Sequence, residues 1–272
     1  FDQAAGGTYA GVLSGTGALV KDGTGIVTLS NTGNSYSGAT TVSGGILRAG
    51  AADVFGDESA VTIAAGATLD LNNFNQAIGS LAGAGSVTLG SATLTTTPAA
   101  ATTFTGVISG SGGLVTAGIN TVTLTGANTY TGGTTVSAGS PLRGSTAGIQ
   151  GNITNSGQVE FNQGTNGTYA GIISGTGDVA KTGTGAVTLS ANNTYTGSTN
   201  LSNGSLFVNG SISNSTITVQ TGTVLGGDGT VGVILVTGGT VAPGLSPAIL
   251  NSGTVTFDAA STFTVELDGA TV

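Results

Sequence analysis

The sequence predicts an all-β protein built as a parallel β-helix, and three observations lead to this fold class. Alternating runs such as "VTIAAGATLDL" and "SATLTTT" have the period of strands with one buried face. The 272 residues include 51 glycines but only 6% charged residues, too few for ordinary surface helices. A related block of residues also recurs three times, which is typical of a solenoid.

The three copies occupy residues 8–50, 103–144 and 168–210, and further coils are expected over 211–272. Each copy of about 43 residues suits two coils of roughly 20 residues, in which parallel strands pair at about 4.8 Å. The whole segment, 1–272, is therefore predicted to be a single β-helix of about a dozen coils.

Each copy carries an aromatic residue near its start and a second aromatic in the pattern N-[ST]-Y-[ST]-G. We expect each aromatic to lie over its counterpart or to cap a turn, and glycines to form coil corners where φ is positive. A row of carbohydrate-binding aromatics is the alternative. These positions are Tyr9, Phe104 and Tyr169, then Tyr36, Tyr130 and Tyr195, then Gly38, Gly132 and Gly197.

The glycine-rich block "SGTGDVAKTGTGAVTLS", residues 174–190, resembles a phosphate-binding loop only superficially. A phosphate cradle needs a helix N-terminus after its glycines, but the alternating "AVTLS" predicts a strand. Lys181 follows Ala180 instead of the glycine that a Walker loop requires, and the second copy has Thr116 in its place. We therefore expect a turn, a strand and a turn, with Lys181 as a solvated side chain.

Composition excludes several classes of function. The net charge is −8, and the four cations are Lys21, Arg48, Arg143 and Lys181, so no nucleic-acid partner and no anionic membrane surface is expected. No apolar run is long enough to span a membrane as a helix. The chain has no cysteine and no histidine, which excludes disulfides, structural zinc and a Ser-His-Asp centre.

Two acidic stretches deserve comparison with metal sites. Asp228, in "GGDGTVG", resembles one fragment of a calcium-binding Gly-Asp repeat, but a single copy supplies too few oxygens. Asp53, Asp57 and Glu58 share one loop, which we interpret as a solvated turn. Asp57 and Glu58 would point to opposite faces of a strand, unlike the paired carboxylates of a glycosidase. We predict no catalytic, cofactor-binding or metal-binding residue.

The repeats resemble the passenger-associated transport repeats of autotransporters, which are secreted through the outer membrane of Gram-negative bacteria by type V secretion. The resemblance rests on "SGTG…K.GTG.VTLS", "N-[ST]-Y-[ST]-G" and "T-T-V-S-x-G", and on a tail with "LGGDGTVG" and "APGLSP". It implies a right-handed β-helix from the carboxyl-terminal part of a passenger, with a structural turn at Pro243, Gly244 and Pro247. It also implies a membrane β-barrel as the partner in the same polypeptide. The amino end, "FDQAAGGTYAG", lacks an initiator Met, so we expect an excised segment.

The expected function is that of a stalk on the cell surface, tethered to the outer membrane. It would project distal regions, and the resemblance implies that it also aids passenger folding and secretion. Direct adhesion, to a host ligand or between like cells, is the alternative. A polysaccharide-cleaving β-helix is a third hypothesis, but the acids are mostly scattered singly, so we predict a protein that is not an enzyme.

Overall fold

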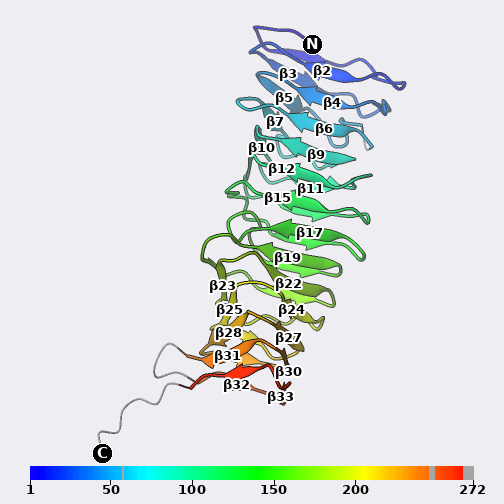
Figure 1. The fold of residues 1–272 in the computed structure, drawn as a ribbon. Coiled ribbons are helices and arrows are strands. Elements are labelled where there is room, and N and C mark those ends of the chain that lie inside the picture. Colours follow the sequence, from blue (N-terminus) through cyan, green and yellow to red (C-terminus); the bar gives the residue numbers. More distant parts are fainter. Residues whose placement is uncertain (57, 245–248, 266–272) are drawn as a thin grey trace, which may run out of the picture. The chain divides into compact units, whose positions relative to one another are not determined.

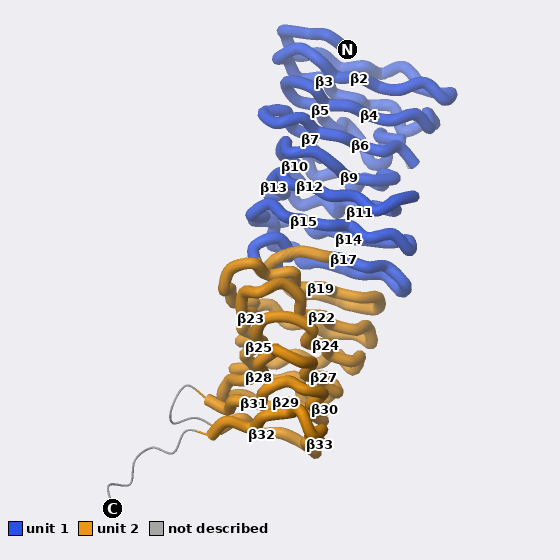
Figure 2. Tube along the Cα trace, viewed as in Figure 1, with its two compact units in different colours: residues 1–142, 147–151 blue, residues 143–146, 152–272 orange. Residues whose placement is uncertain are grey.

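The structure, a computed structural model, describes residues 1–56, 58–244 and 249–265. The described residues form a parallel β-solenoid of about 13 turns and contain no helix, which confirms the predicted fold class. The chain divides into two compact units (Figure 2). Unit 1 comprises residues 1–142 and 147–151, and unit 2 comprises residues 143–146 and 152–272. Whether the chain behaves as the single β-helix that the sequence predicts stays a prediction.

Unit 1 contains three stacks of parallel strands, in which strands of successive coils lie side by side (Figure 1). The β1 stack is β1 (Gly7–Tyr9), β3 (Ile26–Leu29), β5 (Ile46–Ala49), β7 (Thr68–Asp70), β10 (Ser86–Thr88) and β13 (Val107–Ser109). The β2 stack is β2 (Leu19–Lys21), β4 (Thr40–Val42), β6 (Ala60–Ile63), β9 (Ser80–Gly83), β12 (Thr102–Phe104) and β15 (Val122–Leu124). The β8 stack is β8 (Gln76–Ile78), β11 (Leu94–Thr96), β14 (Leu114–Thr116) and β16 (Thr134–Val136). The strand β17 (Pro141–Gly144) is shared between the units: Leu142 belongs to unit 1, and Arg143 belongs to unit 2.

Unit 2 is also built from stacks of parallel strands. It has two long stacks, named here after β19 and β20, and two shorter stacks. The β19 stack is β19 (Gln158–Asn162), β22 (Asp178–Thr182), β24 (Thr199–Leu201), β27 (Ile217–Gln220), β30 (Ile234–Thr237) and β33 (Val255–Phe257). The β20 stack is β20 (Gly167–Tyr169), β23 (Ala186–Leu189), β25 (Ser205–Val208), β28 (Val224–Gly227), β31 (Thr240–Pro243) and β34 (Thr262–Phe263). The shorter stacks are β18 (Ile153–Asn155) with β21 (Ile173–Gly175), and β26 (Ser211–Ile212) with β29 (Thr230–Val231) and β32 (Asn251–Ser252).

The core of each unit consists of columns of aliphatic side chains, because registered parallel strands place equivalent residues above one another. In unit 1, one column runs Val27, Leu47, Leu69, Val87 and Ile108, each of which is buried. Unit 2 has the corresponding column Val187, Leu206, Leu225 and Val241. Alternate residues of the same strands point outward, so the period-2 pattern of the sequence separates core from surface.

The sequence repeat is out of phase with the coil in unit 1. Residues 26–29 of the first copy form β3 in the β1 stack, whereas residues 122–124 of the second copy form β15 in the β2 stack. Equivalent residues of these two copies therefore occupy different sides of the unit. The expectation that repeat aromatics lie over their counterparts is wrong here, because Tyr36 precedes a strand of the β2 stack and Tyr130 precedes a strand of the β8 stack.

The predicted carboxyl-terminal turn is only partly within the described residues. Pro243 is the last residue of β31, and Gly244 follows it with a φ of 86°. That φ is positive, so glycine suits this position better than a residue with a side chain. Pro247 lies outside the described residues.

Candidate functional site

The repeated motif forms a buried hydrogen-bonded turn built around its tyrosine. In unit 1 the hydroxyl of Tyr36 lies 2.8 Å from Oγ1 of Thr40, which lies 2.8 Å from Oγ of Ser59. Ser59 in turn donates to the carbonyl oxygen of Gly38 over 2.8 Å, which closes a ring of hydroxyl groups. The ring supplies a partner for each buried hydroxyl, as burial of polar groups requires.

The third copy reproduces this arrangement, and the second copy keeps its tyrosine–threonine bond, with the backbone of Gln150 in place of the serine. In unit 2, Tyr195 bonds to Thr199 over 2.6 Å, Thr199 to Ser215 over 2.7 Å, and Ser215 donates to the Gly197 carbonyl over 2.7 Å. In the second copy, Tyr130 bonds to Oγ1 of Thr134 over 2.7 Å. The tyrosine therefore caps a turn, one of the two roles expected from the sequence. Burial raises the pKa of Tyr195 to about 12, so its phenol stays a neutral partner.

The asparagine of the motif connects consecutive coils, a role that the sequence analysis missed. Asn34 accepts the N–H of Leu13 from the preceding coil and donates to the carbonyl of Val54 in the following coil. Both bonds are 2.8 Å long. Asn128 and Asn193 do the same in the other copies. The signal in the sequence was that an asparagine stands two residues before the tyrosine in all three copies. An amide that bonds to both neighbouring coils is needed at the same place in each copy.

The motif glycines are required by close packing between coils. A Cβ atom on Gly38 would overlap the carbonyl group of Gly17, and one on Gly197 would overlap that of Gly177. A Cβ on Gly132 would likewise overlap the backbone of the preceding coil. None of the three motif glycines has a positive φ, so the conformational reason expected for them is wrong. Positive φ belongs instead to glycines of the glycine-rich block, such as Gly183 at 76°.

The aromatic position at the start of each copy also faces the interior. Phe104 and Tyr169 are buried, whereas Tyr9, on the first described strand, is half-buried. Tyr169 packs against Phe161 with ring centroids 5.0 Å apart, and Tyr9 against Phe1 at 5.2 Å. These side chains are not arranged as an exposed aromatic row, so the carbohydrate alternative finds no support at these positions.

The lysine of the glycine-rich block is buried, which corrects the prediction that Lys181 is solvated. Only 1% of Lys181 is exposed, and its Nζ donates to the carbonyl oxygens of Thr182, Gly183 and Asn203 over 2.7–3.0 Å. The first two carbonyls belong to its own coil and the third belongs to the next. Alternation places Lys181 on the inward face of β22, and the ammonium group reaches the turn at the end of the strand, where carbonyls are free.

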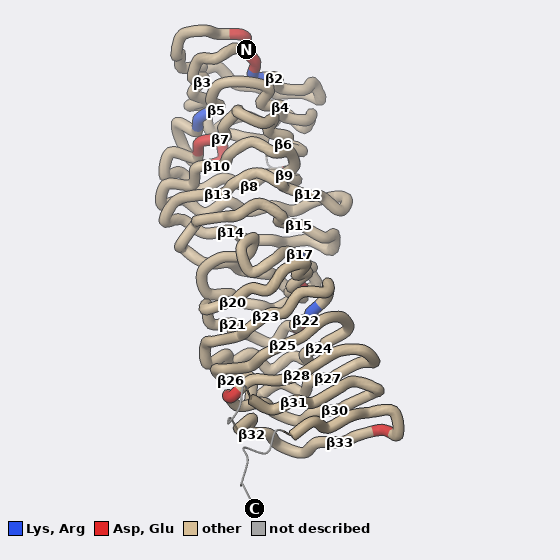
Figure 3. The backbone as a smooth tube through the Cα atoms, turned by 60° about the vertical axis from the view of Figure 1, so that its left-hand side comes forward, with Lys and Arg blue, Asp and Glu red and all other residues tan. Residues whose placement is uncertain are grey.

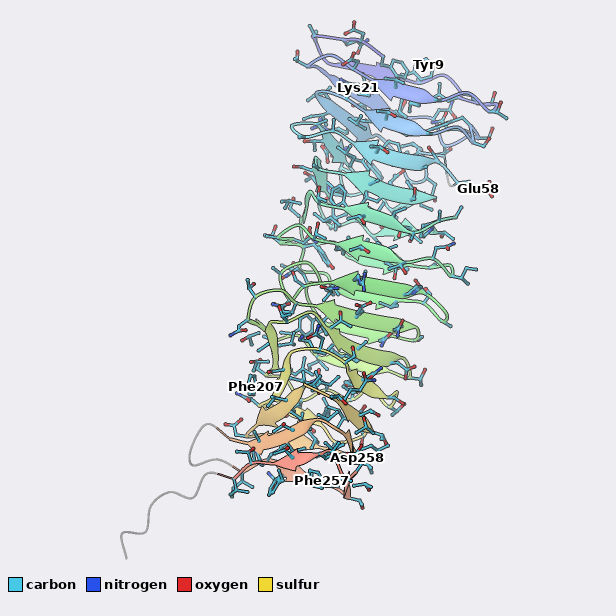
Figure 4. The ribbon with its side chains drawn as sticks, viewed as in Figure 1. Tyr9, Lys21, Glu58, Phe207, Phe257 and Asp258 are labelled. Atoms are coloured by element: carbon cyan, nitrogen blue, oxygen red, sulfur yellow. The ribbon has the colours of Figure 1, made fainter. Side chains whose placement is uncertain are left out.

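Lys21 has the same arrangement in unit 1 (Figure 4). Its Nζ donates to the carbonyls of Asp22, Gly23 and Gly44 over 2.5–3.0 Å, and the side chain is fully buried. Burial lowers the pKa of Lys21, and it lowers the pKa of Lys181 to about 8. The lysine of the repeat thus links two consecutive coils through hydrogen bonds from its ammonium group. Neither ammonium is available to hold a phosphate group.

The two arginines form ion pairs between neighbouring coils. Nε of Arg48 donates to Oδ2 of Asp70, and Nη2 of Arg143 donates to Oε1 of Glu160, each over 2.7 Å. Burial works to raise the pKa of Glu160, but hydrogen bonds from Arg143 and Thr182 outweigh it and lower that pKa. These pairs are partly exposed, so each contributes on the order of 0–1 kcal/mol.

The acidic side chains of the described residues do not assemble into a metal site. No group of three or more His, Cys, Asp or Glu could hold a metal ion in the described part of the chain. Asp53 has a φ of 50°, a turn conformation, and Asp57 lies outside the described residues. In Figure 3, where charged residues are coloured along the backbone, only a few positions of the two units are red or blue.

The motif residues bond mainly to their own coil and to the neighbouring coils. This use of the motif is typical of a structural repeat protein. The model of one family, the passenger-associated-transport-repeat, matches residues 19–49, 114–140 and 179–207, within the three copies read from the sequence. These three matches support an autotransporter passenger domain.

Two relatives are similar to parts of the chain. The chain is 46% identical over 140 residues to the adhesin BmaC autotransporter of Brucella suis biovar 1 (strain 1330). The alignment covers 48% of this chain and 4% of that protein. It is also 38% identical over 101 residues to an extracellular serine protease of Serratia marcescens, covering 36% of this chain and 10% of the relative. No solved structure matches the chain. Within the described residues, no helix has the length and apolar character needed to cross a membrane.

Proposed function

We propose that this segment is a non-enzymatic stalk on the cell surface, which presents other regions of the passenger and contributes to adhesion. The observation that carries the proposal is how the motif side chains are used. The asparagine, tyrosine and lysine of the repeats all bond between or within coils, and the motif glycines allow coils to touch. The polar side chains and the glycines of the repeat thus serve to hold one coil on the next.

The proposal extends to the tether and to secretion. The passenger family implies an outer-membrane β-barrel in the same polypeptide, and hence a place on the surface of a Gram-negative bacterium. Each finished coil offers an edge on which the next coil can pair, so growth from the carboxyl-terminal end would help secretion to proceed.

Direct adhesion is the second candidate, because one relative is named an adhesin. The serine-protease relative does not extend its activity to this segment, since the chain has no histidine for a Ser-His-Asp centre. A polysaccharide-cleaving site is also disfavoured. Two hollows of unit 2 each have one carboxylate in their lining, Asp228 in one and Asp178 in the other, whereas a glycosidase needs two.

The stalk role is tested by deleting coils from the full-length protein in its bacterium. Leu19 pairs with Thr40 and Thr40 with Val61, so deleting residues 19–60 removes two whole coils and leaves Val61 in the register of Leu19. We expect surface display close to that of the parent, measured by antibody labelling of intact cells. Deleting residues 19–29 removes only part of a coil and should reduce display more than the whole-coil deletion, because residues 7–9 lose the strand with which they pair.

Equal loss of display in both deletions would contradict the stalk proposal, since a stalk tolerates a change of length that preserves its register. Attachment of cells to host surfaces is measured in parallel. If the whole-coil deletion keeps display but abolishes attachment, unit 1 holds the adhesive surface, which would favour the direct-adhesin candidate.

A further inference from the structure

The outer face of the β20 stack in unit 2 contains a hollow that the repeat motif does not explain. It spans four successive coils and has a volume of about 270 Å³. Its floor includes Phe207, whose side chain lies on the outer side of the unit in Figure 4 and is half-buried. The residues that line it include Asn166, Ala186, Thr188, Phe207, Asn209 and Asp228.

A substitution within the repeat creates this hollow. Thr28 of the first copy pairs with Arg48, and the equivalent Thr188 of the third copy pairs with Phe207, so the phenyl ring replaces an arginine. In the next coil Arg48 faces Asp70, and the two side chains fill the surface as an ion pair. Phe207 instead faces Gly226, whose neighbour in the following coil is Ala242.

Gly226 has no side chain and Ala242 has a small one, so the ring of Phe207 packs against the backbone of the next coil. A Cβ atom placed on Gly226 would lie 3.0 Å from Cδ1 and Cε1 of Phe207, so the ring lies over the glycine. Ala186 and Thr188 on the preceding strand are also small. The ring of Phe207 thus lies in a shallow depression on the outer face of the β20 stack.

Polar groups lie at both ends of this depression. Oδ1 of Asn166 accepts the N–H of Ala186 over 2.9 Å, which fixes the side chain and leaves its amide N–H groups as donors. At the other end, the exposed side chains of Asn209 and Asp228 form no hydrogen bond with the rest of the described chain. An apolar ring with a few convergent donors and acceptors is the composition of a small-ligand site.

We propose that this hollow binds a neutral pyranose sugar as part of a surface glycan. The C–H groups of one sugar face would lie on Phe207, where the negative face of the aromatic ring attracts them. The hydroxyl groups would bond to the amides of Asn166 and Asn209 and to the carboxylate of Asp228. No cation lines the hollow, and Asp228 repels anions, so a phosphate or sulfate ligand does not suit it.

This inference rests on the adhesive part of the proposed function and gives it a ligand class. Its test is titration of the 272-residue chain with methyl β-D-galactopyranoside and methyl β-D-glucopyranoside, followed by backbone amide NMR. One sugar in a shallow site makes few contacts, so we expect a dissociation constant on the order of 1–10 mM for at least one of them. The amide signals that shift should be those of Phe207, Asn209 and Asp228.

Phe207→Ala should weaken binding at least tenfold, while Phe207→Tyr, which keeps the ring face, should retain it. Phe257→Ala is the matched control, because Phe257 is an exposed phenylalanine elsewhere in unit 2 (Figure 4), and it should bind as the parent does. Methyl β-D-glucuronide should bind more weakly than the glucoside, because its carboxylate meets Asp228.

Absence of shifts with both neutral sugars at 50 mM would overturn the site, as would unchanged binding by Phe207→Ala. Circular dichroism of each variant checks that its β-structure is intact. The coil deletions in unit 1 leave this hollow in place, so failure of the sugar site and failure of the stalk proposal give separate results.

Discussion

At the scale of single residues, the lysine of the repeat shows how burial changes the meaning of a charge. Lys181 and Lys21 are the only lysines in the sequence, and both occupy inward positions with three backbone carbonyls around the ammonium group. Removing a charge from water is costly unless hydrogen bonds replace its hydration. The three carbonyls supply those bonds, and the desolvation that remains lowers the pKa of both lysines.

The lowered pKa of Lys181 predicts how stability depends on pH. With a pKa of about 8 in the folded state and an ordinary 10.5 when unfolded, Lys181 binds its proton more tightly in the unfolded chain. Stability should therefore rise between pH 8 and 10.5 and be unaffected by this group below pH 8. In Lys181→Met this rise should be smaller by about 2 kcal/mol between pH 8 and 9.5. Denaturant unfolding at several pH values measures it.

The control is Tyr195→Phe, because the tyrosine acts in the opposite direction at higher pH. Its pKa is about 12 in the folded state and 10.0 ordinarily, so it should lower stability between pH 10 and 12. The control should keep the rise between pH 8 and 9.5. Identical pH profiles for the parent and Lys181→Met would contradict the assignment of the rise to Lys181.

At the scale of elements, coils stack because their corners contain residues without side chains. Gly197 lies against Gly177 of the preceding coil, and Gly38 against Gly17, so the coil spacing leaves no room for a Cβ atom. Parallel strands need a spacing of about 4.8 Å to form their hydrogen bonds, which fixes how near the turns must come. The glycine is thus determined by the hydrogen bonds of the strands that flank it.

Replacing Gly197 with alanine should destabilise unit 2 by about 3 kcal/mol, because the added methyl group overlaps backbone atoms that cannot move without separating coils. Gly164→Ala in the same unit is the control. Its Cβ would meet nothing within 4 Å and its φ is not positive, so we expect a change within about 0.5 kcal/mol. Chemical denaturation followed by circular dichroism measures both, and a similar cost for the two variants would refute the packing argument.

At the scale of the whole molecule, the strand pairs of the described residues join segments about one coil apart in the sequence. Asn31, for example, donates to Ala10, 21 residues earlier, and the other inter-coil bonds have similar separations. Each new coil therefore needs a finished edge, and folding is expected to spread from one region. The proposed role in secretion requires that region to lie towards the carboxyl-terminal end.

The matched glycines of the two units test this order of folding. If unit 2 folds first, Gly197→Ala should slow refolding, whereas Gly38→Ala in unit 1 should mainly accelerate unfolding. Stopped-flow or manual-mixing refolding, followed by far-ultraviolet circular dichroism, separates the two effects. The reverse assignment would mean that unit 1 nucleates folding, and it would remove the support for the secretion role.

The fold could be predicted from the sequence because its causes are local and repeated. Period-2 alternation, as in residues 26–29, fixes which side chains face inward, and the repeat fixes the size of a coil. The positive φ of Gly183 could be predicted for the same reason, since a corner recurs where the strand must end. Asn34 was missed because its partners, Leu13 and Val54, lie in adjacent coils, and the recurrence of N-x-Y does not by itself identify them.

The sequence by itself determined an all-β solenoid, the positions of its repeats and the absence of histidine and cysteine chemistry. These properties depend on residue types and their spacing along the chain. Only the tertiary structure decided that Lys181 is buried, that the motif glycines serve close packing, and that Phe207 lies beside Gly226 in a hollow. Those three depend on which residue of the neighbouring coil lies opposite, and the register between coils is set by how the strands pair in space.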